Sequence, residues 1–312
     1  MGPCFDSLLL GKISRIEEER KRRGEAEEDS EDGDRNKKSR SARLSGRGMS
    51  AGGEGAWFSF SAANSAEGWE RMMDVYRTLQ EKFRDVAAAN GLLREKVTVR
   101  AKVLSTEEAI GNPEEDDFPL QKGRERLMEA EFLDGRGQAF TDRYGAFEGT
   151  VTDVVAGRLD NNYRRAVFVA TLNAMLRHLG LADKTVHCRD KEPALCAGEL
   201  ASYLESLYKG SGIVQIGFQP RMIDAVSRRF LLRVVDLDPQ NIGTQPFGVT
   251  VEGPESTKDA IEWADVLLVT GSTLVNGTIG SFLGEKPTIF YGTTIAGAAG
   301  LMGWQRFCGC GH

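Results

Sequence analysis

The stretch ADVLLVTGSTLVNGTI, residues 264–279, decides the fold class of this chain. Residues 266–270 (VLLVT) are apolar and rich in β-branched side chains, which is typical of a short strand buried on both faces of a sheet. A turn of glycine and hydroxyl residues follows, and a helix is predicted over 276–283. A buried strand that turns directly into a helix is the repeating unit of a parallel sheet.

Three other segments have the same character. They are IVQIG at 213–217, LLRVVDL at 231–237 and TIFY at 288–291, and a further helix is predicted over 220–229. Short buried strands that alternate with helices favour an α/β fold with a doubly wound parallel sheet. Ligands of such sheets bind outside the carboxyl ends of the strands. We therefore expect the function to lie in the residues that follow each strand.

Glycine, hydroxyl and acidic residues follow these predicted strands. Backbone N–H groups and hydroxyls in such turns are suited to an anion. Asp236 follows Gly217 by the interval at which dinucleotide-binding domains keep an acid for a ribose hydroxyl. No complete G-x-G-x-x-G or G-x-x-x-x-G-K-[ST] occurs, so simple turn and capping chemistry remains an alternative. The candidate ligand residues are Gly217, Gln219, Asp236, Gly271, Ser272, Thr273, Asn276, Gly292, Thr293 and Thr294.

A second set of residues has the chemistry of soft metal ligands. The segment HCRDKEPALC at 187–196 and the chain end CGCGH at 308–312 contain thiols and imidazoles that suit a transition or heavy metal ion. No C-x-x-C pair is present, so buried apolar cysteines and a loose tail remain alternatives. The two segments can share one ion only if the tail folds back onto the loop after Val186. The candidate metal ligands are His187, Cys188, Cys196, Cys308, Cys310 and His312.

The N-terminal half shows helical and extended patterns. A helix is predicted over 67–90, strands over 97–104 and 147–156, and a helix over 163–179 that ends at Gly180. His178 is expected to be a helix-terminal cation or a capped polar group rather than a catalyst. Apolar residues at three- and four-residue steps predict one core-facing stripe on the first helix, made of Trp69, Met72, Met73, Tyr76, Leu79, Phe83, Val86 and Ala87.

Composition limits the class of protein. The 312 residues carry a net charge of −6, with 40% hydrophobic and 28% charged residues, which is a globular balance. No apolar run approaches the roughly 20 residues that span a bilayer, and no signal pattern is seen, so a soluble, cytoplasmic protein is expected. The acidic balance argues against a nucleic-acid partner. Five cysteines favour free thiols or metal ligands over a disulfide framework.

Residues 1–50 differ from the rest of the chain. They contain 12 Lys and Arg, 11 Asp and Glu, and a single aromatic residue, Phe5. Such a segment cannot bury enough apolar surface to fold, so it is predicted to be a disordered tail. Order is expected to begin near Trp57, and the acidic stretch at 111–119 is expected to be a solvated loop.

Several of these stretches together resemble an uncharacterised prokaryotic family described as heavy-metal-chelation proteins. The resemblance is good over residues 140–307, poor over 57–139 and absent over the first 50. It implies an α+β domain similar to the enolase N-terminal domain at 57–182, a Rossmann-like domain at 183–312, and a site in the cleft between them. The stretches are RAVFVATLNAMLRHL at 165–179, GIVQIGFQPRMIDAV at 212–226, VVDLDPQNIG at 234–243, ADVLLVTGSTLVNGTI at 264–279 and PTIFYGTTIAGAAG at 287–300.

The resemblance also implies site positions. It places Asn173, Gly217, Gln219, Asp236, Ser272, Thr273, Thr293 and Thr294 in the family's cleft motifs, and it assigns no role to the cysteines. The leading hypothesis is metal chelation or metal handling at the interdomain cleft, with the anionic part of a small ligand held by the glycine and hydroxyl turns. The alternatives are a Rossmann-type transferase or oxidoreductase with a nucleotide-like cofactor, Asp236 then binding the ribose, and a non-catalytic small-molecule sensor. The expected partners are a metal ion and a small anionic ligand, without nucleic acid or membrane; a homo-oligomer is left open.

Overall fold

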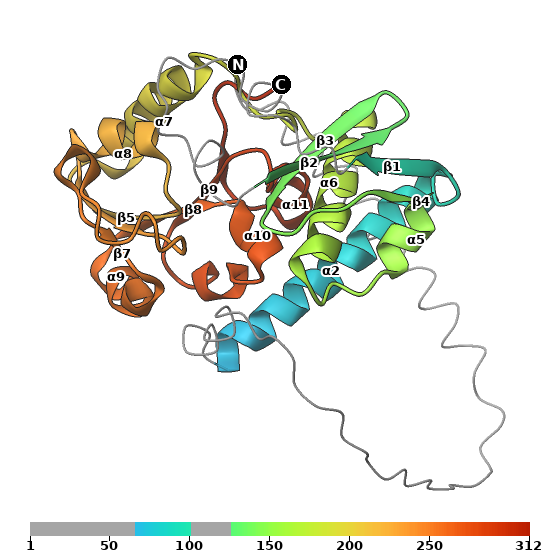
Figure 1. Cartoon of the computed structure of the whole chain (residues 1–312), viewed down its shortest axis with the longest axis horizontal. Helices are drawn as coiled ribbons and strands as arrows, with labels where there is room; N and C mark the ends of the chain where they lie inside the picture. The colour runs from blue at the N-terminus through green and yellow to red at the C-terminus, as the bar shows by residue number, and fades with distance from the viewer. Residues whose placement is uncertain (1–65, 101–125) are drawn as a thin grey trace, which may run out of the picture. The chain divides into compact units, whose positions relative to one another are not determined.

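Two β-sheets organise the part of the chain that the computed structural model describes, residues 66–100 and 126–312 (Figure 1). All of these residues belong to one compact unit, residues 61–312. The predicted tail at 1–50, the predicted start of order near Trp57 and the acidic stretch at 111–119 lie outside the described residues.

The larger sheet is parallel throughout, which confirms the α/β class. Its strand order is β10-β9-β8-β5-β6-β7, so the order reverses between β5 and β8. All four predicted strands of this half are present. The strands are β5 Gly212–Ile216, β6 Leu231–Val235, β7 Val251–Glu252, β8 Val266–Thr270, β9 Thr288–Tyr291 and β10 Arg306–Phe307.

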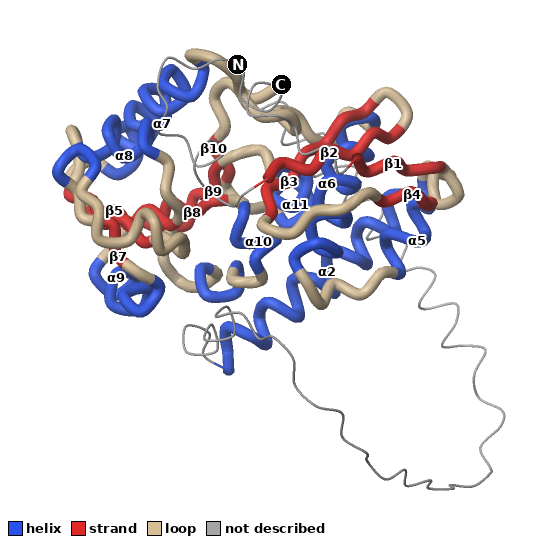
Figure 2. The backbone as a smooth tube through the Cα atoms, viewed as in Figure 1, coloured by secondary structure: helices blue, strands red, loops and turns tan. Residues whose placement is uncertain are grey.

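Helices connect these strands and cover them. Helices α7 and α8 lie side by side (Figure 2) and share an apolar core with the sheet, in which Leu200 and Leu204 of α7 pack with Ile213 of β5 and Leu268 of β8. The helices of this half are α7 Glu192–Tyr208, α8 Pro220–Ser227, α9 Thr257–Trp263, α10 Ser272–Asn276 and α11 Ala296–Met302.

The smaller sheet is antiparallel and packs on α6 (Asn162–His178). Its order is β3-β2-β1-β4, with β1 Lys96–Arg100, β2 Arg126–Phe132, β3 Gly135–Thr141 and β4 Phe147–Thr150. Strand β3 lies directly on the helix backbone, because a Cβ atom at Gly137 would stand 2.2 Å from the amide nitrogen of Ala174. Only glycine permits this approach. The other helices among the described residues of this half are α2 Ala66–Ala89 and α5 Val151–Ala156.

Three sequence predictions are wrong in detail. Two of them concern the N-terminal half, and the third concerns the segment after β8. Trp69 and Met73 are 56% and 51% exposed, because only the adjacent face of α2, with Met72 and Phe83, meets the core. The predicted strand 147–156 stops at Thr150, whose side chain accepts from the amide of Asp153 in a capping box and starts α5. The predicted helix 276–283 is broken, since Gly277 adopts a left-handed φ of 75° that ends α10, and a short 3₁₀ turn, Ile279–Phe282, follows.

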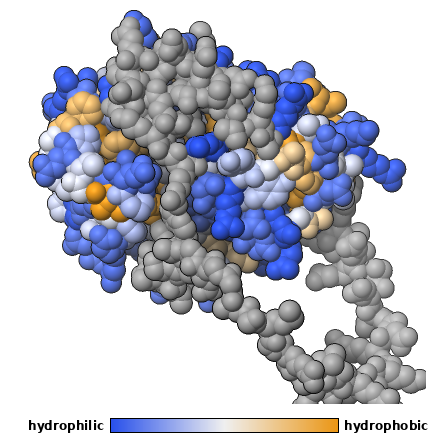
Figure 3. Space-filling model, viewed as in Figure 1, coloured by the Kyte–Doolittle hydropathy of each residue, from blue (hydrophilic) through white to orange (hydrophobic). Residues whose placement is uncertain are grey.

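Contact with a membrane depends on the length and hydropathy of the helices and on the hydropathy of the exposed surface. Within residues 66–100 and 126–312, no helix is both long and apolar enough to cross a membrane. On the face shown in Figure 3, the described residues are mostly hydrophilic, and hydrophobic residues form separate patches.

Candidate functional site

The first pair of candidate ligands lies at the start of α7. Cys188 belongs to the loop before the helix and is 8% exposed, and Cys196 lies in its second turn and is 5% exposed. Cys196 falls on the same helical face as Leu200 and Leu204, which packs against the sheet, and this periodicity buries its thiol.

The C-terminal segment folds back onto the loop that holds Cys188 (Figure 1). Val186 and His312 exchange two backbone hydrogen bonds of 2.9 Å each. The ammonium group of Lys184 donates to the carbonyl oxygens of Cys308 at 2.6 Å and Gly309 at 2.7 Å. Lys184 itself has a positive φ of 51°, a conformation that non-glycine residues adopt at a cost. The condition for a shared site, a tail that returns to the loop after Val186, is met.

This folding gathers four thiols. The amide of Gly309 donates to the sulfur of Cys196 at 3.3 Å, and Cys310 packs against the core cluster that contains Cys196. Burial, and then the charges that would form on Cys196, Cys308 and Cys310, raise the pKa of the Cys188 thiol well above its usual range. The same two causes raise the pKa of Cys310 to about 11, with Cys196 as its first electrostatic neighbour. Electrostatic coupling therefore acts between all pairs of these four thiols.

The two candidate imidazole ligands are held differently. Nδ1 of His187 lies 2.6 Å from the carbonyl oxygen of Cys188 and donates to it, which leaves Nε2 with a lone pair. Burial lowers the pKa of His187 to about 4, so this ring is neutral at pH 7 and suited to binding a metal. Nε2 of His312 lies 2.9 Å from a carboxylate oxygen of Glu192.

The gathered donors do not yet form a coordination shell. Among the described residues, no three His, Cys, Asp or Glu side chains are arranged so that they could hold a metal ion. The donor chemistry nevertheless fits a soft ion, because thiolates and neutral imidazole are its preferred ligands. Protonated thiols are poor metal ligands, so an ion that bound here would have to displace their protons and draw the sulfurs closer together.

The glycine and hydroxyl turns are largely committed to internal bonds. Thr273 donates from its hydroxyl to the carbonyl of Thr270 at 2.8 Å, and the Thr294 hydroxyl accepts from the amide of Phe140 at 3.1 Å. The Tyr291 hydroxyl lies over the end of β5, 3.1 Å from the carbonyl of Gly217. The Thr293 hydroxyl is buried without a partner among the described residues. The predicted anion site at these turns, which also include Gly271, Ser272, Asn276 and Gly292, stays a prediction.

Asp236 also has protein partners. One carboxylate oxygen accepts from the backbone amide of Phe218 at 2.8 Å. The other accepts from the backbone amide of Asp238 at 2.9 Å and from the side-chain amide of Asn241 at 3.0 Å. Gln219 caps α8 by accepting from the amide of Arg221 at 3.2 Å. A ribose would have to compete with these bonds, and the nucleotide role of Asp236 stays a prediction.

Asn173 connects the two sheets. Its fully buried side chain donates to the carbonyls of Gln138, Thr293 and Thr294 at 2.9, 3.2 and 3.1 Å, and accepts from the amide of Gly297 at 2.7 Å. Both N–H donors of the amide group are thereby used within the protein, so Asn173 holds segments of the two sheets together.

Sequence reasoning missed three residues that position the thiol cluster. The side chain of Gln138 accepts from the amide of His187 at 2.7 Å, and Arg306 donates to the carbonyl of Lys184 at 2.8 Å. Lys184 holds the tail through its bonds to the carbonyl oxygens of Cys308 and Gly309. None of the three stands in a motif, and their roles come from contacts between segments far apart in the sequence.

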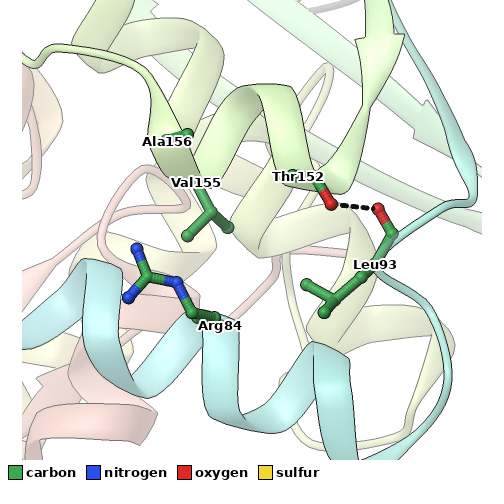
Figure 4. A pocket seen from close by; sticks show the side chains of 5 residues that line it. All are labelled: Arg84, Leu93, Thr152, Val155 and Ala156. Carbon is green, nitrogen blue, oxygen red and sulfur yellow. Dashed lines mark hydrogen bonds between the residues drawn. The ribbon is translucent and has the colours of Figure 1, made fainter.

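Two surface cavities are lined by other residues. One, of about 90 Å³, is lined by Arg84, Leu93, Thr152, Val155 and Ala156 (Figure 4), where Thr152 donates to the carbonyl of Leu93 at 2.8 Å. The other, of about 310 Å³, lies between Phe282, Phe290 and Trp304, at the amino-terminal side of β9. Neither is lined by a predicted site residue.

Comparison with known proteins gives a match to one family model and no established activity. Residues 200–294 match the family DUF364, described as "Putative heavy-metal chelation", which confirms the family resemblance. A protein of unknown function from this family in Pyrococcus horikoshii is similar, with 14% identity, a TM-score of 0.43, and coverage of 70% of this chain and 79% of its own. Another, from Desulfitobacterium hafniense DCB-2, has 12% identity, a TM-score of 0.41, and coverage of 57% and 72%. None of the curated proteins matches the chain.

Proposed function

We propose that this protein binds a thiophilic heavy or transition metal ion through Cys188, Cys196, Cys308 and Cys310. One observation carries the proposal: the paired backbone bonds between Val186 and His312 return the chain end, with Cys308 and Cys310, to the loop that holds Cys188, and Gly309 contacts the sulfur of Cys196. The description of the matching family as heavy-metal chelators supports the same chemistry.

The surroundings of the thiols suit an anionic metal centre. Four thiolates around a divalent ion leave a net charge of about −2. Burial raises the pKa of the Cys308 thiol, and the charges of Arg306 and Lys184 oppose that rise. The same two cations would offset part of the negative charge of the centre. Amides of the tail donate to the sulfurs of Cys196 and Cys308, an outer layer of bonds that orients metal ligands. His187, with its free Nε2, is the candidate to replace one thiol.

We further propose that the half of the chain with the parallel sheet is a Rossmann-like domain. The strand order from β7 through β6, β5, β8 and β9 to β10 supports a Rossmann-like domain, because doubly wound dinucleotide-binding sheets have the order 3-2-1-4-5-6. We place this domain at 183–312 and the enolase N-terminal-like domain at 57–182. Cys308 directly follows β10, so the two terminal thiols follow the carboxyl end of a strand, where such sheets bind ligands. A cytoplasmic location would keep the thiols reduced.

Metal content tests the proposal directly. The full chain is purified under reducing, anaerobic conditions, loaded with zinc or cadmium, freed of excess ion and subjected to elemental analysis. We expect roughly one ion per chain, bound with proton release. The Cys308→Ser, Cys310→Ser double variant should lose most of the ion and keep its far-UV spectrum. Cys4→Ser, which alters the one cysteine that the proposal does not use, is the matched control and should bind like the parent.

Two results would overturn the metal site. One is a parent chain that binds neither ion after anaerobic purification. The other is a double variant that retains full stoichiometry, which would show that the bound ion uses other ligands.

A further inference from the structure

The terminal thiols are unequally placed around Cys196. The amide of Gly309 touches the sulfur of Cys196, so the residues on both sides of Gly309 lie near it. The sulfur of Cys308 lies next to Gly311 of the same segment, since a Cβ atom at Gly311 would stand 2.8 Å from it. Cys310 instead packs against the apolar cluster to which Cys196 belongs. Of the two terminal thiols, Cys310 is therefore the better placed to meet Cys196.

We propose that Cys196 and Cys310 form a reversible disulfide when the metal-free chain meets a small disulfide oxidant such as glutathione disulfide. This inference rests on the thiol cluster of the proposed function, but it requires no metal. Both cysteines are free in this structure.

The reaction is a pair of thiol–disulfide exchanges. The thiolate of Cys310, the partly exposed member, attacks one sulfur of the oxidant, and the first glutathione leaves as a thiolate that takes up a proton. The thiolate of buried Cys196 then attacks the Cys310 sulfur and releases the second glutathione. Two protein thiols lose two electrons and two protons in total, and the oxidant becomes two thiols.

The disulfide would close a long loop. All six strands of the parallel sheet lie between Cys196 and Cys310 in the sequence. Joining the ends of a loop of about 110 residues removes much of the freedom of the unfolded chain and should raise the melting temperature by on the order of 10 °C. Dithiothreitol should reverse this rise.

Peptide mapping tests the proposal. The full chain is treated with EDTA, oxidised with glutathione disulfide, alkylated and digested with trypsin without reduction. Trypsin separates the cysteines into residues 185–189 with Cys188, residues 192–209 with Cys196, and residues 307–312 with both terminal cysteines. We expect peptide 192–209 linked to peptide 307–312. The link should persist in Cys308→Ser and Cys188→Ser and fall at least tenfold in Cys310→Ser, a change near the chain end that leaves the core intact.

Three outcomes would overturn the disulfide: no link at millimolar oxidant, a link confined to peptide 307–312, or an undiminished link to 192–209 in Cys310→Ser. The metal measurement fails separately. A chain that binds zinc but forms no link refutes the disulfide alone, and a chain that forms the link but binds no zinc or cadmium refutes the metal site alone.

Discussion

Val186 and His312 form a two-way backbone bridge, each amide donating to the other's carbonyl at 2.9 Å. This bridge joins the loop before α7 to the last residue of the chain. Because the loop carries Cys188 and the terminal segment carries Cys308 and Cys310, the bridge fixes the distance between donors that are far apart in sequence. The metal affinity of the site should therefore depend on the backbone of the last five residues as well as on the thiols.

Gly311→Ala should weaken metal binding about tenfold, comparable to the loss of an outer-layer contact. A Cβ atom there would stand 2.8 Å from the Cys308 sulfur and 2.9 Å from Cβ of Lys184, so the tail must shift. Gly309→Ala is the control, because its Cβ would meet the movable carboxylate of Glu199 at 2.3 Å and the Cys196 sulfur only at 3.4 Å. Competition with a chelator measures both affinities, and equal losses in the two variants would contradict the role of the bridge.

Asn173→Ala should lower the free energy of unfolding by about 2–4 kcal/mol, because it leaves buried carbonyls and the Gly297 amide without their partner. Asn90→Ala removes a single bond to the carbonyl of Val86 at an exposed helix end and should cost about 1 kcal/mol or less. Urea unfolding measures both. If the two costs were alike, Asn173 would not connect the sheets as the bonds indicate.

Replacing each of the two neighbouring threonines after β9 by valine should change the free energy of unfolding differently. Thr294→Val removes the acceptor of the Phe140 amide and should cost about 1–2 kcal/mol. Thr293→Val replaces a buried hydroxyl that has no partner among the described residues and should be neutral or stabilising. Thermal and urea unfolding compare the two. A large loss in Thr293→Val would show that its hydroxyl has a partner, such as a bound water or ligand.

Local pattern was enough to predict much of the parallel sheet. Strands β5, β6, β8 and β9 are apolar and β-branched, and they lie where periodicity placed them. The hairpin of β2 and β3 was missed because Gly135 and Gly137 weaken the strand signal, and these glycines are required by the approach to α6 rather than by the strand itself. Strands β7 and β10 have two residues each, too few to show a period.

The candidate site was predictable in chemistry but not in arrangement. Thiols and imidazoles could be recognised as soft donors from their residue types alone. Their gathering depends on Lys184, Arg306 and the Val186 to His312 bridge, which are contacts of the folded chain. Asn173 illustrates the converse, since its place in a family motif predicted a ligand contact while its four bonds all go to the protein.

The ion pair of Arg233 and Glu252 should make stability fall in acid. Arg233 donates to both carboxylate oxygens of Glu252, at 2.7 and 2.6 Å, and these bonds hold the pKa of Glu252 below its ordinary value of 4.5. A lowered carboxyl pKa contributes stability that is fully present above the ordinary value and is lost as the pH falls below it. Glu252→Gln should therefore cost about 1–2 kcal/mol at pH 7 and less at pH 3.5.

Asp259→Asn is the matched control for this ion pair. Asp259 accepts from the same guanidinium at 2.7 Å, but its side chain is 78% exposed, against 23% for Glu252. Solvent screens an exposed pair, so its loss should cost under about 1 kcal/mol. Urea unfolding of the parent and both variants at the two pH values provides the comparison. A Glu252→Gln variant whose deficit stays the same at pH 3.5 as at pH 7 would show that the ionised carboxylate is not the source of the stability.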